Sequence, residues 1–126
     1  MAIRMTQHLF VYGTLRRGAR NRFAAMLARS ARFIGPAKAR GRLYRIKHYP
    51  GFVPRGPHTG WVLGDVFAVP QRGKLLQALD LYEGLAFERT TTKVVLSSGR
   101  TIRAWVYCYA LDIKGKRRIV SGDFFL

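Results

Sequence analysis

The stretch LFVYGTLRRG, residues 9–18, decides the fold. Four apolar or aromatic residues are followed by Gly13 and, after Thr14 and Leu15, by a pair of arginines. A short apolar run that stops at a glycine is typical of a buried strand, which we expect over residues 8–12. The end of such a strand leaves backbone N–H groups beside strong positive charge. The stretch therefore predicts either an ordinary strand and turn or a site that binds an anionic group.

Downstream of this strand, the sequence predicts two short helices. Asn21 is a suitable N-cap for a helix over residues 22–31, in which apolar residues recur at helical spacing. Residues 73–83 carry leucines and a tyrosine at helical spacing, and Gly84 follows as a stop signal.

The other regular segments read as strands. Residues 37–44 alternate between small or apolar side chains and mainly basic ones, which predicts a half-buried strand with a basic outer face. Before them, Gly35-Pro36 is expected to break the chain. Residues 49–60 hold three of the five prolines and read as a loop. Further strands are predicted over residues 61–69, 89–96 and 101–109, the last two as a hairpin, and a short apolar segment follows over residues 119–126.

These segments amount to about six strands and two short helices. Because the strands do not alternate regularly with helices, the pattern favours the α+β class over a parallel, doubly wound sheet. We expect one globular domain over residues 1–126, built on a small, mixed but largely antiparallel β-barrel.

The chain is strongly basic, since 23 Lys and Arg outnumber 6 Asp and Glu and the formal net charge is +17. Such a field favours anionic partners, among them nucleic acid and carboxylate-bearing metabolites. No apolar run approaches the ~20 residues of a membrane helix, and the first residues lack the apolar core of a signal peptide. We therefore expect a cytoplasmic protein with no membrane partner. Cys108, the only cysteine, is expected to be a small core residue rather than a nucleophile.

Few side chains could carry acid–base or metal chemistry, because the sequence has only six carboxylates and three histidines. No nucleophile-elbow motif supports a Ser/His/Asp triad, and the histidines show no i, i+4 pairing of the kind that binds metal. The turn at Gly13 is not a Walker-type phosphate loop. The sequence therefore predicts no metal site.

Glu83 is the most informative carboxylate. It stands in the last turn of the second predicted helix, where the helix dipole disfavours negative charge and burial would disfavour it further. Both effects raise the pKa of the carboxyl group from ~4.3 towards neutrality, as a general acid or base requires. The alternative is an exposed glutamate at a frayed helix end.

Several motifs occur in a recognisable order along the chain. VYGTLRRG stands near the N-terminus, YPGFVP in the middle, LDLYEG is followed by FERTTTKV, and RAWVYCY and SGDF come last. From Leu9 to Phe124 this order resembles the γ-glutamylcyclotransferase-like family. The resemblance implies a small mixed β-barrel with a pocket at one end, which cleaves γ-glutamyl amides to 5-oxoproline and a free amine. It also implies that neither a metal nor an organic cofactor takes part.

The resemblance further implies which residues form the site. The catalytic glutamate of the family matches Glu83, and its late-strand tyrosine matches Tyr107. Phe87 stands where the family often has a tyrosine, so a hydrogen bond from that hydroxyl would be lost. The substrate-binding loop Tyr-Gly-Ser/Thr-x of the family matches Tyr12, Gly13, Thr14 and Leu15.

In this interpretation the substrate is a small γ-glutamyl molecule, and its α-amine attacks its own γ-carbonyl. Glu83 removes a proton from the α-ammonium group and later returns it to the leaving amine. Backbone N–H groups of the loop bind the α-carboxylate or the oxyanion that forms on the γ-carbonyl. Arg16 and Arg17 either contact the substrate, add a favourable field, or lie in a solvated turn. The identity of the leaving amine and the oligomeric state stay open.

Four other charged residues have simpler expected roles. Asp65 is expected to be a structural carboxylate that bonds to backbone or pairs with an arginine. Asp80 is expected to hold the loop after its helix. Glu88 and Arg89 are expected to form a local pair at the surface.

Two alternatives to the enzyme remain. A basic face of Lys38, Arg40 and Arg42, with a second cluster over residues 114–118, fits the electrostatic footprint of a nucleic-acid-binding module. A member of the family that kept the barrel and lost or changed its chemistry is also compatible with the sequence, because a fold does not fix a function.

Overall fold

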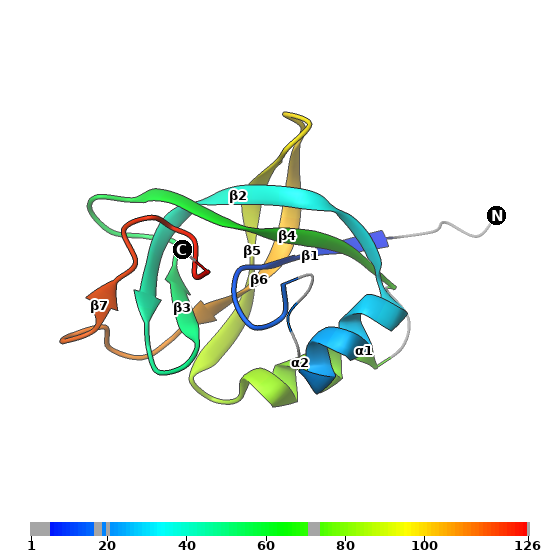
Figure 1. The fold of residues 1–126 in the computed structure, drawn as a ribbon, viewed down its shortest axis with the longest axis horizontal. Helices are drawn as coiled ribbons and strands as arrows, with labels where there is room; N and C mark the ends of the chain where they lie inside the picture. The colour runs from blue at the N-terminus through cyan, green and yellow to red at the C-terminus, as the bar shows by residue number, and fades with distance from the viewer. Residues whose placement is uncertain (1–5, 17–18, 20, 71–73, 126) are drawn as a thin grey trace.

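The computed structural model describes residues 6–16, 19, 21–70 and 74–125. Within these residues the chain forms seven strands and two helices (Figure 1). In chain order they are β1 (Thr6–Val11), α1 (Arg22–Ser30), β2 (Arg32–Arg45), β3 (Pro50–Val53), β4 (Gly60–Pro70), α2 (Leu75–Glu83), β5 (Phe87–Leu96), β6 (Thr101–Tyr109) and β7 (Arg117–Arg118).

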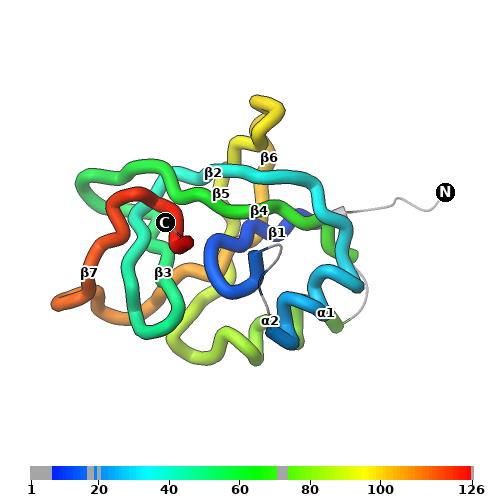
Figure 2. The backbone as a smooth tube through the Cα atoms, viewed as in Figure 1, coloured from blue at the N-terminus to red at the C-terminus, as the bar shows by residue number. Residues whose placement is uncertain are grey.

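Five of the strands close a barrel. β1 pairs antiparallel with β4, β4 with β2, and β2 with β3, whereas β3 runs parallel to β6. The barrel closes where β6 meets β1 in parallel, at Trp105 and Leu9. β5 forms a hairpin with β6 and also touches β2, and the course of the whole chain can be followed in Figure 2. This arrangement confirms the predicted α+β class with a small mixed barrel.

The second half of β1, residues 9–11, is apolar because both of its faces are buried. Phe10 and the adjoining Tyr12 belong to the core cluster inside the barrel. Leu9 and Val11 belong to a second cluster, which includes residues of both helices. Since successive side chains of a strand point to opposite faces, the part of a strand that lies between two cores is apolar at every position.

The two helices lie together along one side of the barrel (Figure 1). Asn21 caps α1 as predicted, because its side-chain oxygen accepts a hydrogen bond of 2.8 Å from the backbone N–H of Ala24. α2 ends at Glu83, and Gly84 follows with φ 76°, a left-handed conformation that glycine adopts without strain. Leu27 of α1 and Leu79 of α2 are fully buried in the second cluster. Neither helix, at nine residues each, is long enough to cross a membrane.

The structure corrects the predictions for residues 35–36 and for residues 49–60. Gly35-Pro36 does not break the chain, because β2 runs through it and a register shift between Phe33 and Gly35 absorbs the irregularity. The segment 119–126 forms no strand in its described part, whereas Arg117 and Arg118 of the preceding basic turn pair with β2.

The predicted loop over residues 49–60 is also partly wrong, since it begins with strand β3. Pro50 stands first in this strand, a position where the missing N–H is tolerated. Phe52 is fully buried and packs against Phe10 and Tyr12 inside the barrel. The burial of one large aromatic ring therefore outweighs the turn-forming composition of the segment.

Candidate active site

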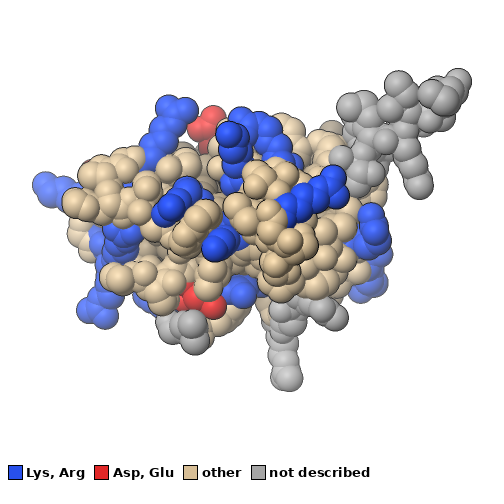
Figure 3. Space-filling view, turned by 90° about the horizontal axis from the view of Figure 1, so that it is seen from above, with Lys and Arg blue, Asp and Glu red and all other residues tan. Residues whose placement is uncertain are grey.

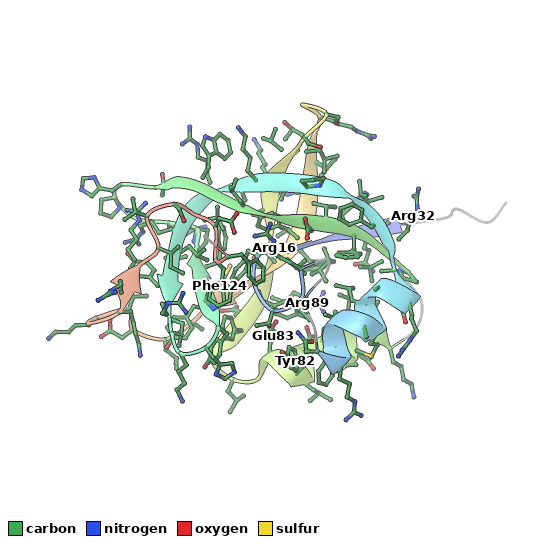
Figure 4. All side chains as sticks on the ribbon, in the orientation of Figure 1. Arg16, Arg32, Tyr82, Glu83, Arg89 and Phe124 are labelled. Carbon is green, nitrogen blue, oxygen red and sulfur yellow. The ribbon has the colours of Figure 1, made fainter. Side chains whose placement is uncertain are left out.

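A cavity of about 490 Å³ lies where β1 and α2 both end. Its walls come from the end of β1 and the loop after it, the N-cap of α1, the last turn of α2, the segment that joins β2 to β3, the first residues of β3 and β5, and one residue of β6. Figure 4 shows Tyr82 and Glu83 beside each other at the end of α2. All six residues predicted for the site line this cavity: Tyr12, Gly13, Thr14, Leu15, Glu83 and Tyr107.

Glu83 is the half-buried last residue of α2. Burial raises the pKa of its carboxyl group from 4.5 to about 7, because a charged carboxylate is poorly solvated there. Its negative charge in turn contributes to raising the pKa of the Tyr12 and Tyr107 hydroxyls. No described residue donates a hydrogen bond to the carboxylate or forms an ion pair with it. A group of this kind can exchange a proton near neutral pH.

The loop after β1 makes a tight turn, closed by a 3.0 Å hydrogen bond from the N–H of Arg16 to the carbonyl of Gly13. Within the described part of the chain, the N–H groups of Gly13, Thr14 and Leu15 have no acceptor. A Cβ at Gly13 would lie 2.7 Å from two ring carbons of Pro50, so only glycine permits this contact between the loop and β3. The turn therefore places three consecutive N–H donors in the wall that also contains Glu83.

Both helices hold this loop in place. The Asn21 side chain that caps α1 also donates a hydrogen bond from its amide nitrogen to the carbonyl of Thr14. The hydroxyl of Tyr82, on α2, lies 3.3 Å from the hydroxyl of Thr14, and its ring stacks on Phe23 of α1 with centroids 4.0 Å apart. Sequence reasoning identified Asn21 as a cap and missed its bond to the loop, which no local pattern signals.

Tyr12 uses its hydroxyl to join three strands of the barrel. The hydroxyl donates a hydrogen bond to the carbonyl of Tyr107 on β6 and accepts one of 3.2 Å from the N–H of Phe52 on β3. Burial raises the pKa of this hydroxyl well above its usual value, so it stays protonated. The side chain of Tyr12 thus lines the cavity and ties its wall to β6 and β3.

Asp80 lies one turn before Glu83 and binds two side chains from the sheet. The hydroxyl of Tyr107 donates a hydrogen bond of 2.6 Å to Asp80 Oδ1. Arg89 of β5 donates from Nε to the same oxygen at 2.8 Å and from Nη2 to Oδ2 at 3.2 Å. The predicted pair of Glu88 with Arg89 is therefore wrong, because neighbouring residues of a strand point to opposite faces. Asp80 anchors its helix to the sheet rather than to the loop that follows.

Aromatic side chains form the wall nearest the segment between β2 and β3. The ring of Tyr49 lies 5.1 Å from that of His48 and 5.9 Å from that of Phe87, and Phe87 lies 5.5 Å from Tyr109. Tyr49 and Pro50 line the cavity. Although the protein is strongly basic, no Lys or Arg occurs among the described lining residues.

Arg16 lies outside the described lining and binds carboxylates instead. Its Nη1 donates a hydrogen bond of 2.8 Å to Asp123 Oδ1, and its Nε lies 3.8 Å from Asp65 Oδ2. Asp65 is only 6% exposed, which confirms its expected structural role beside an arginine. Figure 4 shows Arg16 above Glu83, near Phe124. The predicted roles of Arg17 lie outside the described residues.

The other chemically notable groups do not join the site. Cys108 is buried in the barrel core, as predicted, and burial raises the pKa of its thiol to about 11. Among the residues that the structure describes, no group of three His, Cys, Asp or Glu side chains could hold a metal ion.

The basic outer face of β2 forms as predicted. Lys38 and Arg40 both lie over the ring of Trp61 on β4, at 4.4 and 4.2 Å from its centroid. Lysine and arginine side chains are spread widely over the surface seen in Figure 3, with few acidic residues between them.

Comparison with known proteins places the chain in a family. Residues 9–126 match the family described as "Gamma-glutamyl cyclotransferase, AIG2-like". The chain is 30% identical over 117 residues to the gamma-glutamylcyclotransferase family protein YtfP of Escherichia coli K12, covering 92% of this chain and 94% of YtfP. It is 29% identical over 105 residues to MJ1514 of Methanocaldococcus jannaschii, provisionally named a gamma-glutamylcyclotransferase, covering 82% and 84% of the two chains. The structure of YkqA from Bacillus subtilis superposes with a TM-score of 0.75 and 26% identity, over 94% of this chain and 39% of YkqA.

Proposed function

Because the chain belongs to the gamma-glutamyl cyclotransferase, AIG2-like family, we propose that it converts a γ-glutamyl amide to 5-oxoproline and a free amine. The reaction is an acyl transfer within the substrate. The α-amine nitrogen forms a bond to the γ-carbonyl carbon, and the bond from that carbon to the leaving amine breaks. No water is consumed. The α-ammonium group loses two protons as its nitrogen becomes the N–H of the lactam, and the leaving nitrogen gains two and departs as an ammonium ion.

Glu83 is the proposed general base and general acid. A bound α-ammonium group is not nucleophilic until it loses a proton, and an ionised carboxylate with a pKa of about 7 can accept that proton near neutral pH. The protonated carboxyl group then gives the proton to the leaving amine as the carbon–nitrogen bond breaks. A nearby ammonium group lowers the pKa of Glu83, which favours the ionised form needed for the first step.

The N–H groups of Gly13, Thr14 and Leu15 are the proposed anion site. They bind the α-carboxylate of the substrate or the oxyanion that develops on the γ-carbonyl, and donors fixed in advance need no reorganisation as charge develops. The oxygen of Tyr107 keeps a free lone pair after it donates to Asp80, so it is the proposed acceptor for an N–H of the α-amine. Tyr12 contributes by holding the wall against which the glutamyl chain packs.

One observation carries the proposal: a half-buried carboxylate with a raised pKa shares one cavity with three unpaired N–H donors. A γ-glutamyl head group carries one ammonium and one carboxylate, and this cavity offers one partner for each. The described lining holds no arginine or lysine that would compete for Glu83.

The test is release of 5-oxoproline from a set of γ-glutamyl amides, γ-glutamyl dipeptides and glutathione. We expect turnover of at least one substrate, and Glu83→Gln should lower kcat by ~10²–10⁴-fold, the usual contribution of a general acid–base group. Glu88→Gln is the matched control, because it removes an exposed glutamate five residues away. Unchanged turnover in Glu83→Gln would remove Glu83 from the mechanism. Absence of 5-oxoproline with every substrate would contradict the proposed reaction.

A further inference from the structure

The strongest polar cluster behind the cavity consists of Asp80, Tyr107 and Arg89. Its three hydrogen bonds, of 2.6, 2.8 and 3.2 Å, join the last turns of α2 to two adjacent strands of the sheet. Arg89 is fixed on its other side as well, because its guanidinium lies 4.4 Å from the centroid of Trp105. Trp105 in turn donates a hydrogen bond of 2.6 Å to Gln7 of β1. Through this chain of contacts, the end of α2 is tied to β5, β6 and β1.

We propose that Asp80 and Arg89 are positioning residues, which aim the Glu83 carboxylate into the cavity and set its titration by acting as a neutral pair. The inference rests on the proposed function of Glu83. Residues three apart on a helix lie on the same face, one turn apart, so a rigidly held Asp80 fixes the backbone that carries Glu83. Gly84, the residue after Glu83, has no Cβ and nothing within 4 Å of that position, so the helix end has no comparable anchor beyond Glu83.

The charges of Asp80 and Arg89 affect the pKa of Glu83. Asp80 and Arg89 together carry no net charge, so Glu83 titrates according to its burial. Removing the charge of Asp80 leaves the Arg89 cation uncompensated beside the preceding turn of α2, which favours ionised Glu83. Removing the charge of Arg89 leaves the Asp80 anion uncompensated, which disfavours ionised Glu83. The two changes therefore shift the pKa of Glu83 in opposite directions.

Other titratable groups also face Glu83 and must be kept constant. They come from the end of β1, from β6, from the segment between β2 and β3, and from α2 itself: Tyr12, Tyr107, His48, Tyr49 and Tyr82. The tyrosines at the ends of β1 and β6 keep their protons throughout the neutral range, because burial raises the pKa of both hydroxyls. The variants below leave all five unchanged.

The experiment measures the pKa of Glu83 directly. The chain has only two glutamates, Glu83 and Glu88, so glutamate labelled with ¹³C at the side-chain carboxyl carbon gives two NMR signals, which Glu83→Gln assigns. The titration is run on the wild type, Asp80→Asn, Arg89→Met and the double variant. Glu88→Gln and Arg103→Met are matched controls that make the same charge changes at exposed positions. The pH dependence of kcat/KM for 5-oxoproline release is measured on the same proteins.

We expect the pKa of Glu83 to fall in Asp80→Asn and to rise in Arg89→Met, each by on the order of one pH unit. In the double variant, the pKa of Glu83 should return to its wild-type value. The pH at which kcat/KM declines on the acid side should shift in the same direction as the pKa of Glu83. In the double variant, kcat should stay below the wild-type value by roughly tenfold, with KM little changed, because the anchor is lost although the charge balance is restored.

Shifts in the same direction, or shifts no larger than those of the controls, would overturn the inference. A folded double variant with wild-type kcat would overturn the positioning role. If the NMR shifts appear as expected but no γ-glutamyl amide is turned over by the wild type, the proposed function fails while the control of Glu83 by the pair stands.

Discussion

At the scale of single residues, the raised pKa of Glu83 suits this carboxyl group to proton transfer and also lowers the stability of the folded chain at high pH. Its carboxyl group has a pKa of about 7 in the folded chain and an ordinary value near 4.5 when exposed. The folded state therefore binds this proton more tightly than the unfolded state does. Stability from this group is fully present below pH 4.5 and is lost as the pH rises through 7.

Replacing Glu83 with glutamine should therefore stabilise the protein at alkaline pH. We expect the free energy of unfolding of Glu83→Gln to exceed that of the wild type by roughly 1–3 kcal/mol at pH 8, and the difference to shrink towards zero below pH 5. Urea unfolding at several pH values measures it. A difference independent of pH would show that Glu83 titrates in the folded chain as it does in water.

The sequence was sufficient to locate Glu83 but not its neighbours in space. A glycine directly after a helical repeat marks the last helical residue, and that local signal placed Glu83 at the end of α2. Asp80 carries no local signal of its role, since its partners Tyr107 and Arg89 come from strands that fold against it. Arg16 was similarly undetermined, because Asp123 lies 107 positions away along the chain.

At the scale of elements, a single side chain, that of Asn21, supports both helix α1 and the loop after β1. Asn21 caps the helix with its oxygen and holds the Thr14 carbonyl with its nitrogen. The two functions can be separated, because an aspartate at this position keeps an acceptor for the cap and loses the donor for the loop.

We expect Asn21→Asp to keep the stability of the wild type within about 0.5 kcal/mol, and Asn21→Ala to lose about 1 kcal/mol. Both should raise KM for a γ-glutamyl amide, because both release the loop that carries the N–H donors. Thermal unfolding and steady-state kinetics on the three proteins measure the two effects. An Asn21→Asp enzyme with wild-type KM would show that the bond to Thr14 does not hold the donors in place.

Element prediction succeeded where one pattern dominated and failed where two competed. The hairpin of β5 and β6 follows from two strand-like runs around a glycine turn, and the structure confirms it. The segment that begins at Pro50 has the composition of a loop, yet Phe52 needs a buried site and finds it only in the barrel. At Gly35-Pro36 the turn signal was overridden by pairing on both sides of β2, which no single segment reveals.

At the scale of the whole molecule, the charge is separate from the cavity. The formal net charge is +17, whereas the described lining contains no Lys or Arg. A field of this kind acts on the encounter with a ligand and not on the chemistry that follows. The role of the basic face as a nucleic-acid surface stays a prediction.

The effect of salt concentration on kcat/KM should therefore depend on the net charge of the substrate. For a γ-glutamyl peptide that ends in a carboxylate, we expect kcat/KM to fall by roughly 2–10-fold between ~20 mM and ~500 mM salt, with kcat unchanged. A γ-glutamyl alkylamide, whose ammonium and carboxylate cancel, is the matched control and should show little dependence. Equal salt dependence of both substrates would contradict a steering role for the surface charge.

The hydrogen bond made by the Tyr12 hydroxyl bears on when the barrel can close during folding. It bonds to Tyr107, 95 positions further along the chain, and the parallel contact of Leu9 with Trp105 closes the barrel at the same place. Such distant contacts are entropically expensive and form late in folding. During synthesis β1 can pair with β4 first, but its contact with β6 must wait until β6 has left the ribosome. A product truncated before β6 would therefore have an open sheet and no enclosed cavity.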